Sequence, residues 1–292
     1  MALRIGFFGA GLIARYHSRS LRVAGRDGEV VAVFDPDRGR AEAFAVETGA
    51  ELCHNEAEVI ERSEAVYVCT WTSEHPRLVE AAAREGRAVF CEKPLAVDLP
   101  LAEAMHRAVD AAGVCHQVGL VLRSSSGFAL VRHLVSQPSA GRVVSVSFRD
   151  DQQLPVGGHY GSDWRADASR AGAGTLLEHS IHDLDLLEWL FGPLARLSSH
   201  AAGLHGLAGI DDTVSVAFAL AAGGTGALTS VWHDMAFRQS NRRLEVLCEH
   251  GRYWAEGNQG EVVGSEEGEG RVRTWDGLAA AGADSSARAP DV

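Results

Sequence analysis

Hydrophobic positions in the first 121 residues come in short runs separated by longer amphipathic segments. Runs rich in β-branched and aromatic side chains predict strands, and the candidates are Leu3–Phe8, Val30–Phe34, Ala65–Cys69, Ala88–Cys91 and Val114–Val121. The intervening segments place apolar residues on one face, which predicts helices over Leu12–Val23, 38–48, 75–85 and 99–112. Since nearly continuous apolar strands that alternate with helices form parallel sheets covered on both sides, residues 1–121 are predicted to be a doubly wound α/β domain.

The pattern changes after residue 121, where strand-like runs outnumber helical ones. Helices are predicted near 127–137 and over Ser180–Leu190, and strands at 142–149, 213–220, 226–233 and 242–249. This order favours a mostly antiparallel open sheet with helices on one face, in a second α/β domain over 122–276. From Gly264 onward the chain is rich in Gly, Glu and Ala, so we expect a poorly ordered tail there, with residues 277–292 outside the second domain.

The composition argues against several functional classes of protein. The 292 residues carry 27 Lys and Arg against 39 Asp and Glu, a net charge of −12, which disfavours a general nucleic-acid binder. No apolar run approaches the length that spans a bilayer, and the N-terminal residues carry no signal-peptide stretch, so we expect no membrane partner. The five scattered cysteines include no C-x-x-C pair and suggest free thiols in a reducing compartment, hence a cytoplasmic protein.

A glycine-rich turn follows the first predicted strand directly. Gly9 and Gly11 belong to a G-x-G-x-x-A sequence at a strand-to-helix junction, where backbone N–H groups and the helix dipole can hold a pyrophosphate. Asp35 ends the second predicted strand, where a carboxylate can accept both ribose hydroxyls of NAD and would repel a 2′-phosphate. Alternatively, Asp35 only forms a turn before Pro36, and Arg38 and Arg40 leave NADP open.

Two later segments carry residues suited to chemistry on an alcohol. Lys93 follows a predicted strand at the sheet edge where ligands bind, although a solvated loop lysine is the simpler interpretation. Glu178, His182 and Asp185 are spaced i, i+4, i+7, which predicts one helix face with an imidazole as general base between two carboxylates. There are two alternatives to this catalytic interpretation. The acidic residues could merely complement a helix dipole, or His179 and His182 could bind a metal together with Glu178; we expect no metal.

Taken together, these segments resemble the Gfo/Idh/MocA family of NAD(P)-dependent oxidoreductases. The resemblance spans about residues 3–192, in the family's order, and rests on the following segments: Gly9 to Ala14 with His17, Asp35, Thr70 to His75, Glu92-Lys93-Pro94, and Gly174 to Asp185 followed by Leu187 to Gly192. It implies a Rossmann domain, a cis Lys93–Pro94 peptide, and a second domain whose open sheet forms homodimers or homotetramers.

The resemblance also implies roles for individual residues. Lys93, Glu178 and His182 would serve the substrate alcohol, with His182 taking the hydroxyl proton, Lys93 holding that oxygen, and Glu178 holding a neighbouring hydroxyl or orienting the imidazole. The expected cofactor-binding residues are Gly9, Gly11, Leu12, Ile13, Asp35, Thr70, Ser73, His75, Glu92 and Lys93. The expected substrate-binding residues are Arg123, Tyr160, Trp164, Arg165, Glu178 and His182, with ordinary packing as the alternative for the first four.

The chain departs from the family's pattern in two places. Glu178 stands where Asp is usual, which argues against assuming the specificity of any relative, and the chain thins out after Trp275. The leading hypothesis is hydride transfer between a nicotinamide and a sugar, a polyol or a related small hydroxylated substrate. The alternatives are a glycoside hydrolase that uses NAD transiently and a non-catalytic NAD-binding sensor.

Overall fold

The protein consists of two compact units, each assembled from several segments of the chain. This computed structural model describes residues 2–25, 28–157, 161–235, 238, 240–256, 259–266 and 269–276. The first unit contains Met1–Leu120, Val156–Glu178 and Ala208–Ile210, and the second contains Val121–Pro155, His179–Leu207 and Asp211–Val292.

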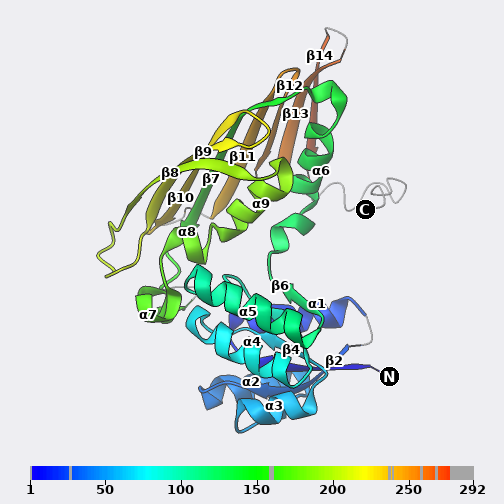
Figure 1. Ribbon diagram of the computed structural model, residues 1–292, viewed down its shortest axis with the longest axis vertical. Helices are drawn as coiled ribbons and strands as arrows, with labels where there is room; N and C mark the ends of the chain where they lie inside the picture. Colours follow the sequence, from blue (N-terminus) through cyan, green and yellow to red (C-terminus); the bar gives the residue numbers. More distant parts are fainter. Residues whose placement is uncertain are drawn as a thin grey trace. The chain divides into compact units, whose positions relative to one another are not determined.

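A parallel sheet of six strands forms the centre of the first unit (Figure 1). Its strands lie in the order β3-β2-β1-β4-β5-β6, with these bounds: β1 Leu3–Phe8, β2 Gly28–Phe34, β3 Glu51–Leu52, β4 Ala65–Val68, β5 Ala88–Cys91 and β6 His116–Val118. Because the order reverses between β1 and β4, a crevice for a ligand is expected outside the carboxyl ends of these two strands.

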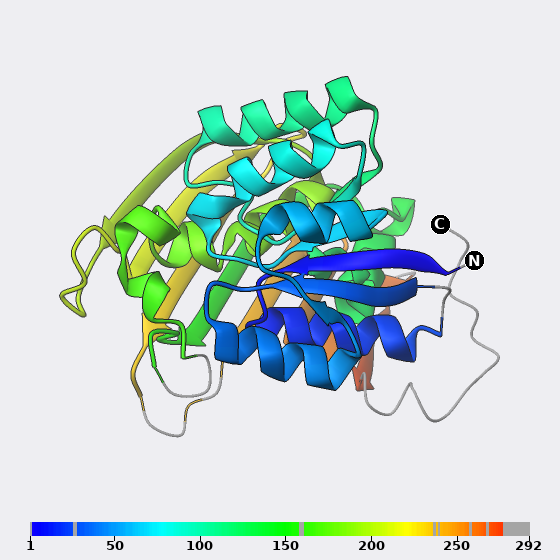
Figure 2. The same ribbon diagram turned by 90° about the horizontal axis from the view of Figure 1, so that it is seen from below.

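Helices cover both faces of this sheet (Figure 2). They are α1 Leu12–Val23, α2 Arg38–Thr48, α3 Glu56–Arg62, α4 His75–Arg84 and α5 Leu99–Ala112. One core cluster joins Ala14 of α1 and Phe44 of α2 to Phe7 and Val33. The other joins side chains of α3, α4 and α5 to alternate residues of the same strands. The doubly wound fold predicted from the alternating pattern is therefore confirmed.

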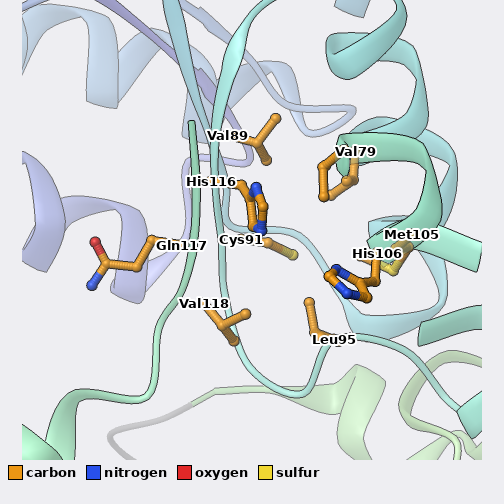
Figure 3. Close-up of a pocket in the computed structure, with 10 residues that line it drawn as sticks. Val79, Val89, Cys91, Leu95, Met105, His106, His116, Gln117 and Val118 are labelled. Carbon is orange, nitrogen blue, oxygen red and sulfur yellow. The ribbon is translucent and has the colours of Figure 1, made fainter. Parts of the chain in front are cut away.

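Polar side chains fix where several of these helices begin. Asp37, Asn55 and Asp98 accept backbone N–H groups at the starts of α2, α3 and α5. Such caps stabilise a helix by about 1 kcal/mol each. An apolar cavity of about 150 Å³ lies where α5 passes β5 and β6, and its lining includes Cys91, Met105, His106 and His116 (Figure 3).

The first unit is completed by short helices that the sequence pattern did not indicate. These elements are the 3₁₀ turns η1 Thr72–Glu74 and η4 Asp163–Ala166 and the short helices α7 Ala168–Ala171 and α8 Thr175–Glu178. Gly172 has φ +86°, and a Cβ there would lie 2.7 Å from that of Val97, so the turn between α7 and α8 requires glycine.

The second unit is built on an eight-stranded sheet in the order β14-β13-β12-β11-β7-β10-β9-β8. The strands are β7 Val143–Gln153, β8 Leu194–Ala202, β9 Thr213–Leu220, β10 Thr225–His233, β11 Asn241–Cys248, β12 Gly251–Glu256, β13 Gln259–Glu266 and β14 Glu269–Asp276. Among the described strands of this second sheet, only β7 and β10 pair in parallel. The predicted mostly antiparallel sheet is confirmed.

The burial pattern of this sheet is one-sided. In β9 and β10, alternate residues such as Val214, Val216, Leu228 and Trp232 are buried, while Ala217, which follows Val216, and Ala227, which precedes Leu228, are exposed. The helices of this unit, α6 Ser126–Val135 and α9 Ile181–Phe191, lie along one face of the sheet (Figure 1), and two 3₁₀ turns, η2 Val121–Ser124 and η3 Pro138–Ala140, flank α6.

The end of the chain corrects one expectation. Residues 264–276 were expected to lack regular structure, but β13 and β14 pair antiparallel along their length. The tail 277–292 lies outside the described residues. In the part of the chain that is described, no helix has the length and apolarity needed to cross a bilayer.

Candidate active site

The glycine-rich turn after β1 is shaped for a ligand that approaches its backbone. Gly9 has φ +90°, and a Cβ there would lie 2.5 Å from the carbonyl oxygen of Cys69, so only glycine fits. A Cβ at Gly11 would instead point into open space, with no atom within 4 Å. The space at Gly11 suits the pyrophosphate of a dinucleotide at the start of α1.

Asp35 holds the glycine-rich turn in place. Its Oδ2 accepts the N–H of Ala10 at 2.8 Å, and its Oδ1 accepts the N–H of Asp37, also at 2.8 Å. The turn-forming role considered as an alternative is therefore present. It does not exclude ribose binding, since an ionised carboxylate offers about four lone pairs.

The nearby arginines have carboxylate partners. Arg38 Nε donates to Glu42 at 2.8 Å, and Arg40 Nε lies 3.3 Å from Asp37. A 2′-phosphate would have to compete with these carboxylates, which favours NAD over NADP. Leu12 and Ile13, at the start of α1, are 38% and 40% exposed, as expected of apolar side chains that a bound cofactor covers.

The turn after β4 is joined to the Lys93–Pro94 turn through His75. His75 is 1% exposed, its Nδ1 lies 2.8 Å from Pro94 O, and its Nε2 lies 3.3 Å from Thr70 O. Burial lowers the pKa of His75, so the neutral ring donates a single hydrogen bond, best to Pro94 O at the shorter distance. His75 thus positions two loops from within the core, while Thr70 and Ser73 remain half-buried.

Glu92 is paired with His17 of α1. The two side chains meet at 2.6 Å between Oε1 and Nε2, and the other oxygen of Glu92 accepts the N–H of Lys93 at 3.1 Å. The ring of His17 also packs against those of Tyr67 and Phe90. Glu92 therefore fixes the backbone from which Lys93 projects.

Lys93 and Glu178 meet inside the first unit. The Lys93–Pro94 peptide is cis, as the family resemblance implies, and Lys93 Nζ donates to the carbonyl oxygen of Glu178 at 2.6 Å. The carboxylate of Glu178 is buried; its Oε1 accepts Thr72 Oγ1 at 2.5 Å, and its Oε2 lies 3.3 Å from Arg165 Nε. Arg165 also stacks over the ring of Trp164, 4.4 Å from its centroid.

The predicted continuous helix from Glu178 to Asp185 is wrong. Glu178 is the last residue of α8, and α9 begins at Ile181, so Glu178 does not share a helix with His182 and Asp185, which both lie in α9. The i, i+4 spacing of polar residues identified candidate side chains but could not show that the backbone breaks between them. His182 itself lies in the first turn of α9 and is 9% exposed.

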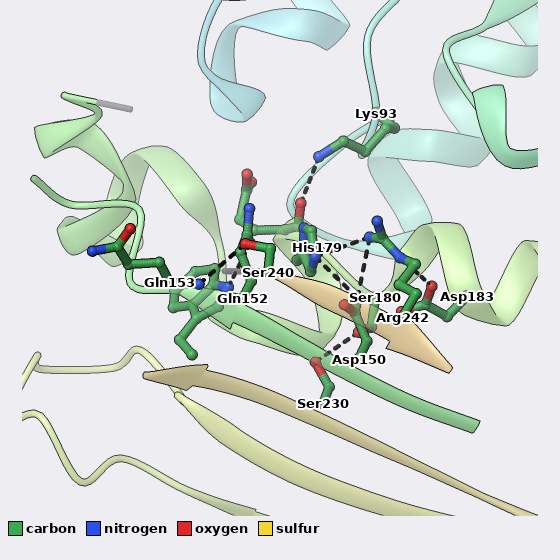
Figure 4. Close-up of polar contacts among 12 residues, drawn as sticks. Lys93, Asp150, Gln152, Gln153, His179, Ser180, Asp183, Ser230, Ser240 and Arg242 are labelled. Carbon is green, nitrogen blue, oxygen red and sulfur yellow. Dashed lines mark hydrogen bonds and ion pairs between the residues drawn. The ribbon is translucent and has the colours of Figure 1, made fainter. Parts of the chain in front are cut away.

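A buried charge cluster surrounds the start of α9 in the second unit (Figure 4). Arg242 of β11 donates from Nε to Asp183 Oδ1 at 2.9 Å, and its Nη2 lies 3.1 Å from Asp150 Oδ2 of β7 and 2.9 Å from His179 Nε2. Two buried carboxylates share one guanidinium here, and burial raises the pKa of Asp183 to about 7. Ser180 and Ser230 add a hydrogen bond of 2.6 Å.

The remaining predicted substrate residues have different surroundings. Arg123 forms a bidentate pair with Asp185 of α9, and one of its bonds, from Nε to Oδ2, is 2.8 Å. Asp185 therefore holds Arg123 and was not predicted to do so. Tyr160 lies outside the described residues.

Comparison with known proteins identifies the family. The sequence profile described as "Oxidoreductase family, NAD-binding Rossmann fold" matches residues 3–120, and that of the GFO/IDH/MocA C-terminal domain matches residues 128–254. The chain is 30% identical to inositol 2-dehydrogenase of Rhizobium meliloti over 281 residues, which cover 94% of this chain and 81% of that protein. The chain belongs to the Gfo/Idh/MocA family.

Solved structures agree with this assignment. The WlbA dehydrogenase from Bordetella pertussis, crystallised with NADH and UDP-GlcNAcA, superposes with a TM-score of 0.84 at 25% identity, over 91% of this chain and 78% of that one. Levoglucosan dehydrogenase in complex with NADH shares the fold, with a TM-score of 0.86 at 20% identity, over 94% of this chain and 80% of that one. This Gfo/Idh/MocA protein is therefore an oxidoreductase with an NAD-binding Rossmann domain.

Several residues of this Gfo/Idh/MocA chain that organise the site were not predicted from sequence. Thr72 bonds to Glu178, and Arg242, Asp150 and Asp183 surround the segment that carries His182. A weak signal existed for two of them, because Asp150 directly follows one predicted strand and Arg242 begins another, at positions whose alternation places them on the buried face. No comparable pattern marks Thr72.

Proposed function

We propose that this protein is an NAD-dependent dehydrogenase that interconverts a secondary alcohol of a cyclitol or sugar with the corresponding ketone. The observation that carries the proposal is the placement of Lys93. It follows β5, two strands from the glycine-rich turn after β1, at the carboxyl edge of one parallel sheet. The substrate class is supported by the similarity to inositol 2-dehydrogenase.

The residues of the first unit fit NAD and a polyhydroxylated substrate. Gly9 and Gly11 would hold the pyrophosphate of NAD and Asp35 its ribose, and the bound cofactor would supply the hydride acceptor. Lys93 donates a hydrogen bond to the alcohol oxygen and stabilises the charge that develops as its proton leaves. Glu178 holds Arg165, whose forked donors and Trp164 stacking suit neighbouring hydroxyls.

His182 is the proposed general base. Its imidazole would take the hydroxyl proton near neutral pH, and NAD held by the first unit would accept the hydride from the same carbon, so that an alcohol and NAD⁺ would yield a ketone, NADH and a proton. The charge cluster of Arg242, Asp150 and Asp183 fixes the helix start that carries this imidazole.

The test is steady-state turnover of a panel of inositols and hexoses with NAD, alongside calorimetric titration of NAD. Lys93→Met is expected to lower kcat at least about 100-fold while the NAD dissociation constant changes less than about threefold, because the ammonium acts on the alcohol rather than on the dinucleotide. Lys93→Arg is the matched control that keeps the charge. His182→Asn should lower kcat similarly.

Three outcomes would contradict the dehydrogenase. Glycoside cleavage without accumulation of NADH would favour the hydrolase. NAD binding without turnover of any polyol or sugar would favour a sensor. Full activity of Lys93→Met would remove the proposed site.

We further propose that the protein is cytoplasmic and assembles into a homodimer or homotetramer through the exposed face of its eight-stranded sheet. The five free cysteines, three of them buried, support a reducing compartment. The exposed face carries small side chains, such as Ala217 and Ala227, which are register partners on β9 and β10. Small side chains allow two such sheet faces to approach closely.

A further inference from the structure

Three potential metal ligands come together at the edge of the parallel sheet, in the first unit. His106 and Asp110 lie on α5, and His116 opens the edge strand β6. One ligand atom from each of the three lies within 4.8 Å of the other two. All three side chains are exposed, and none takes part in the NAD site or the charge cluster described above.

The positions of the three residues suit a metal. His106 and Asp110 are four residues apart on a helix and therefore project from the same face, the spacing that pairs of metal ligands on helices use. His116 comes from a different element, across the turn that ends α5. A metal held by all three would fasten the last turn of α5 to the edge strand.

A hydrogen bond to a backbone carbonyl orients His116 for metal binding. Its Nδ1 lies 3.1 Å from the carbonyl oxygen of Val114, which can only accept, so the ring hydrogen belongs on Nδ1. Nε2 then carries the lone pair. Metal-binding histidines are typically oriented by such a bond from the other ring nitrogen to a backbone carbonyl.

The distances require a moderate adjustment. Ligand atoms about 2.1 Å from a tetrahedral zinc ion are about 3.4 Å apart, so separations of up to 4.8 Å must close by as much as roughly 1.4 Å. His106 Nε2 and Asp110 Oδ2 are already 3.4 Å apart. Exposed side chains can make this movement through their terminal torsions. The two rings are tilted by 62°, with centroids 6.2 Å apart, and so are not stacked against each other.

We propose that His106, Asp110 and His116 bind a divalent transition-metal ion of the class that Zn²⁺ represents, with further positions filled by water. Two imidazoles and one carboxylate suit Zn²⁺, whereas Mg²⁺ and Ca²⁺ prefer sets of oxygen ligands. The net charge of −12 favours cations at this exposed site. Both imidazoles also line the apolar cavity of Figure 3, so the metal would fix two of its walls.

The experiment is calorimetric titration of the full chain with Zn²⁺, without an affinity tag and after treatment with a chelator. We expect one equivalent to bind with a dissociation constant below about 10 μM, and His106→Gln, Asp110→Asn and His116→Gln each to weaken it at least tenfold, since three ligands share the ion. His54→Gln removes an exposed histidine before α3 and is the matched control. NAD titration of each variant, expected unchanged, shows that the first unit remains folded.

A second readout locates the ion. Anomalous diffraction from crystals soaked in Zn²⁺ should give a peak within about 2.2 Å of all three ligand atoms. Three results would each overturn the site. They are the absence of saturable Zn²⁺ binding below about 100 μM, Zn²⁺ binding that survives His116→Gln, and an anomalous peak elsewhere. None of these readouts depends on the proposed dehydrogenase activity.

Discussion

At Asp183, a carboxyl group is enclosed beside a second buried carboxylate, Asp150, with one guanidinium between them. Arg242 Nε donates to Asp183 at 2.9 Å, yet burial still raises the pKa of Asp183 to about 7. One positive charge cannot compensate two carboxylates removed from water, so the cluster favours a proton on one of them near neutral pH. This proton gives the second unit a pH-dependent stability.

The direction of that dependence follows from the raised pKa. Between the ordinary Asp value of 3.8 and about 7, the folded protein holds a proton on Asp183 that the unfolded chain releases. The contribution of this group to stability is therefore present below about pH 4 and is lost as the pH rises through about 7. Asp183→Asn has no titrating group at this position, so its stability should not show this loss as the pH rises.

Urea unfolding at about pH 5 and pH 7.5 measures the effect. From the lower to the higher pH, the free energy of unfolding of the wild type should fall by more than about 1 kcal/mol relative to that of Asp183→Asn, since one pKa unit corresponds to about 1.4 kcal/mol. Titrating groups outside this cluster cancel in the difference. Equal changes in the two proteins would show that Asp183 is ionised throughout.

At the scale of elements, the two glycines of the glycine-rich turn have different surroundings. Gly9 has φ +90° and touches the backbone of Cys69, whereas a Cβ at Gly11 meets nothing within 4 Å. Two neighbouring glycines of one motif thus serve different purposes. Gly9 is required by the backbone of the turn, and we propose that Gly11 is required by the dinucleotide.

Gly11→Ala should leave the melting temperature within about 2 °C of the wild type but weaken NAD binding at least tenfold, because its methyl group occupies the space of the pyrophosphate. Gly9→Ala is the contrasting variant and should lower the melting temperature itself. Thermal denaturation with calorimetric NAD titration checks both. Unchanged NAD affinity in Gly11→Ala would place the dinucleotide elsewhere.

Elements with a strong apolar period were predicted closely from sequence. The bounds of β1, α1 and α5 coincide with those expected, because each has a regular apolar pattern and clear stop signals. Strand β8 was not predicted, since most of its residues are exposed and show no alternation. Strands β13 and β14 were missed because their composition is rich in Gly and Glu, and pairing with each other and with β12 makes them strands.

For the candidate site, the sequence predicted which residues take part but not which of them contact each other. Lys93 and Glu178 were both named, but their meeting through the backbone carbonyl of Glu178 depends on the break between α8 and α9. Contacts between residues 85 positions apart follow from tertiary packing, which local periodicity does not contain. Thr72 was missed for the same reason.

At the scale of the whole molecule, the exposed sheet face is the candidate assembly surface. Ala217 and Ala227 face each other in register across β9 and β10, and a second copy could pack its own small side chains against them. An arginine there would place like charges together across a two-fold axis and open the interface.

Light scattering after size exclusion measures the assembly. The wild type should have at least twice the 31.1 kDa mass of the chain, and Ala217→Arg should run near 31.1 kDa. Val46→Arg, on the exposed side of α2, introduces the same charge in the first unit and should not change the mass. The sheet face would be excluded as the assembly surface if the wild type were monomeric, or if Val46→Arg dissociated the oligomer as much as Ala217→Arg does.

The interleaving of the two units has a consequence for synthesis. The chain passes from one unit to the other after residues 120, 155, 178, 207 and 210. On the ribosome, Lys93 and Thr72 therefore emerge well before Glu178, the residue to which both form hydrogen bonds. At ~5–20 residues per second, the stretch from 120 to 178 takes roughly 3–12 s. During that interval the nascent chain already contains the glycine-rich turn but lacks the carboxylate of Glu178, which contacts Thr72 and Arg165 in the folded protein.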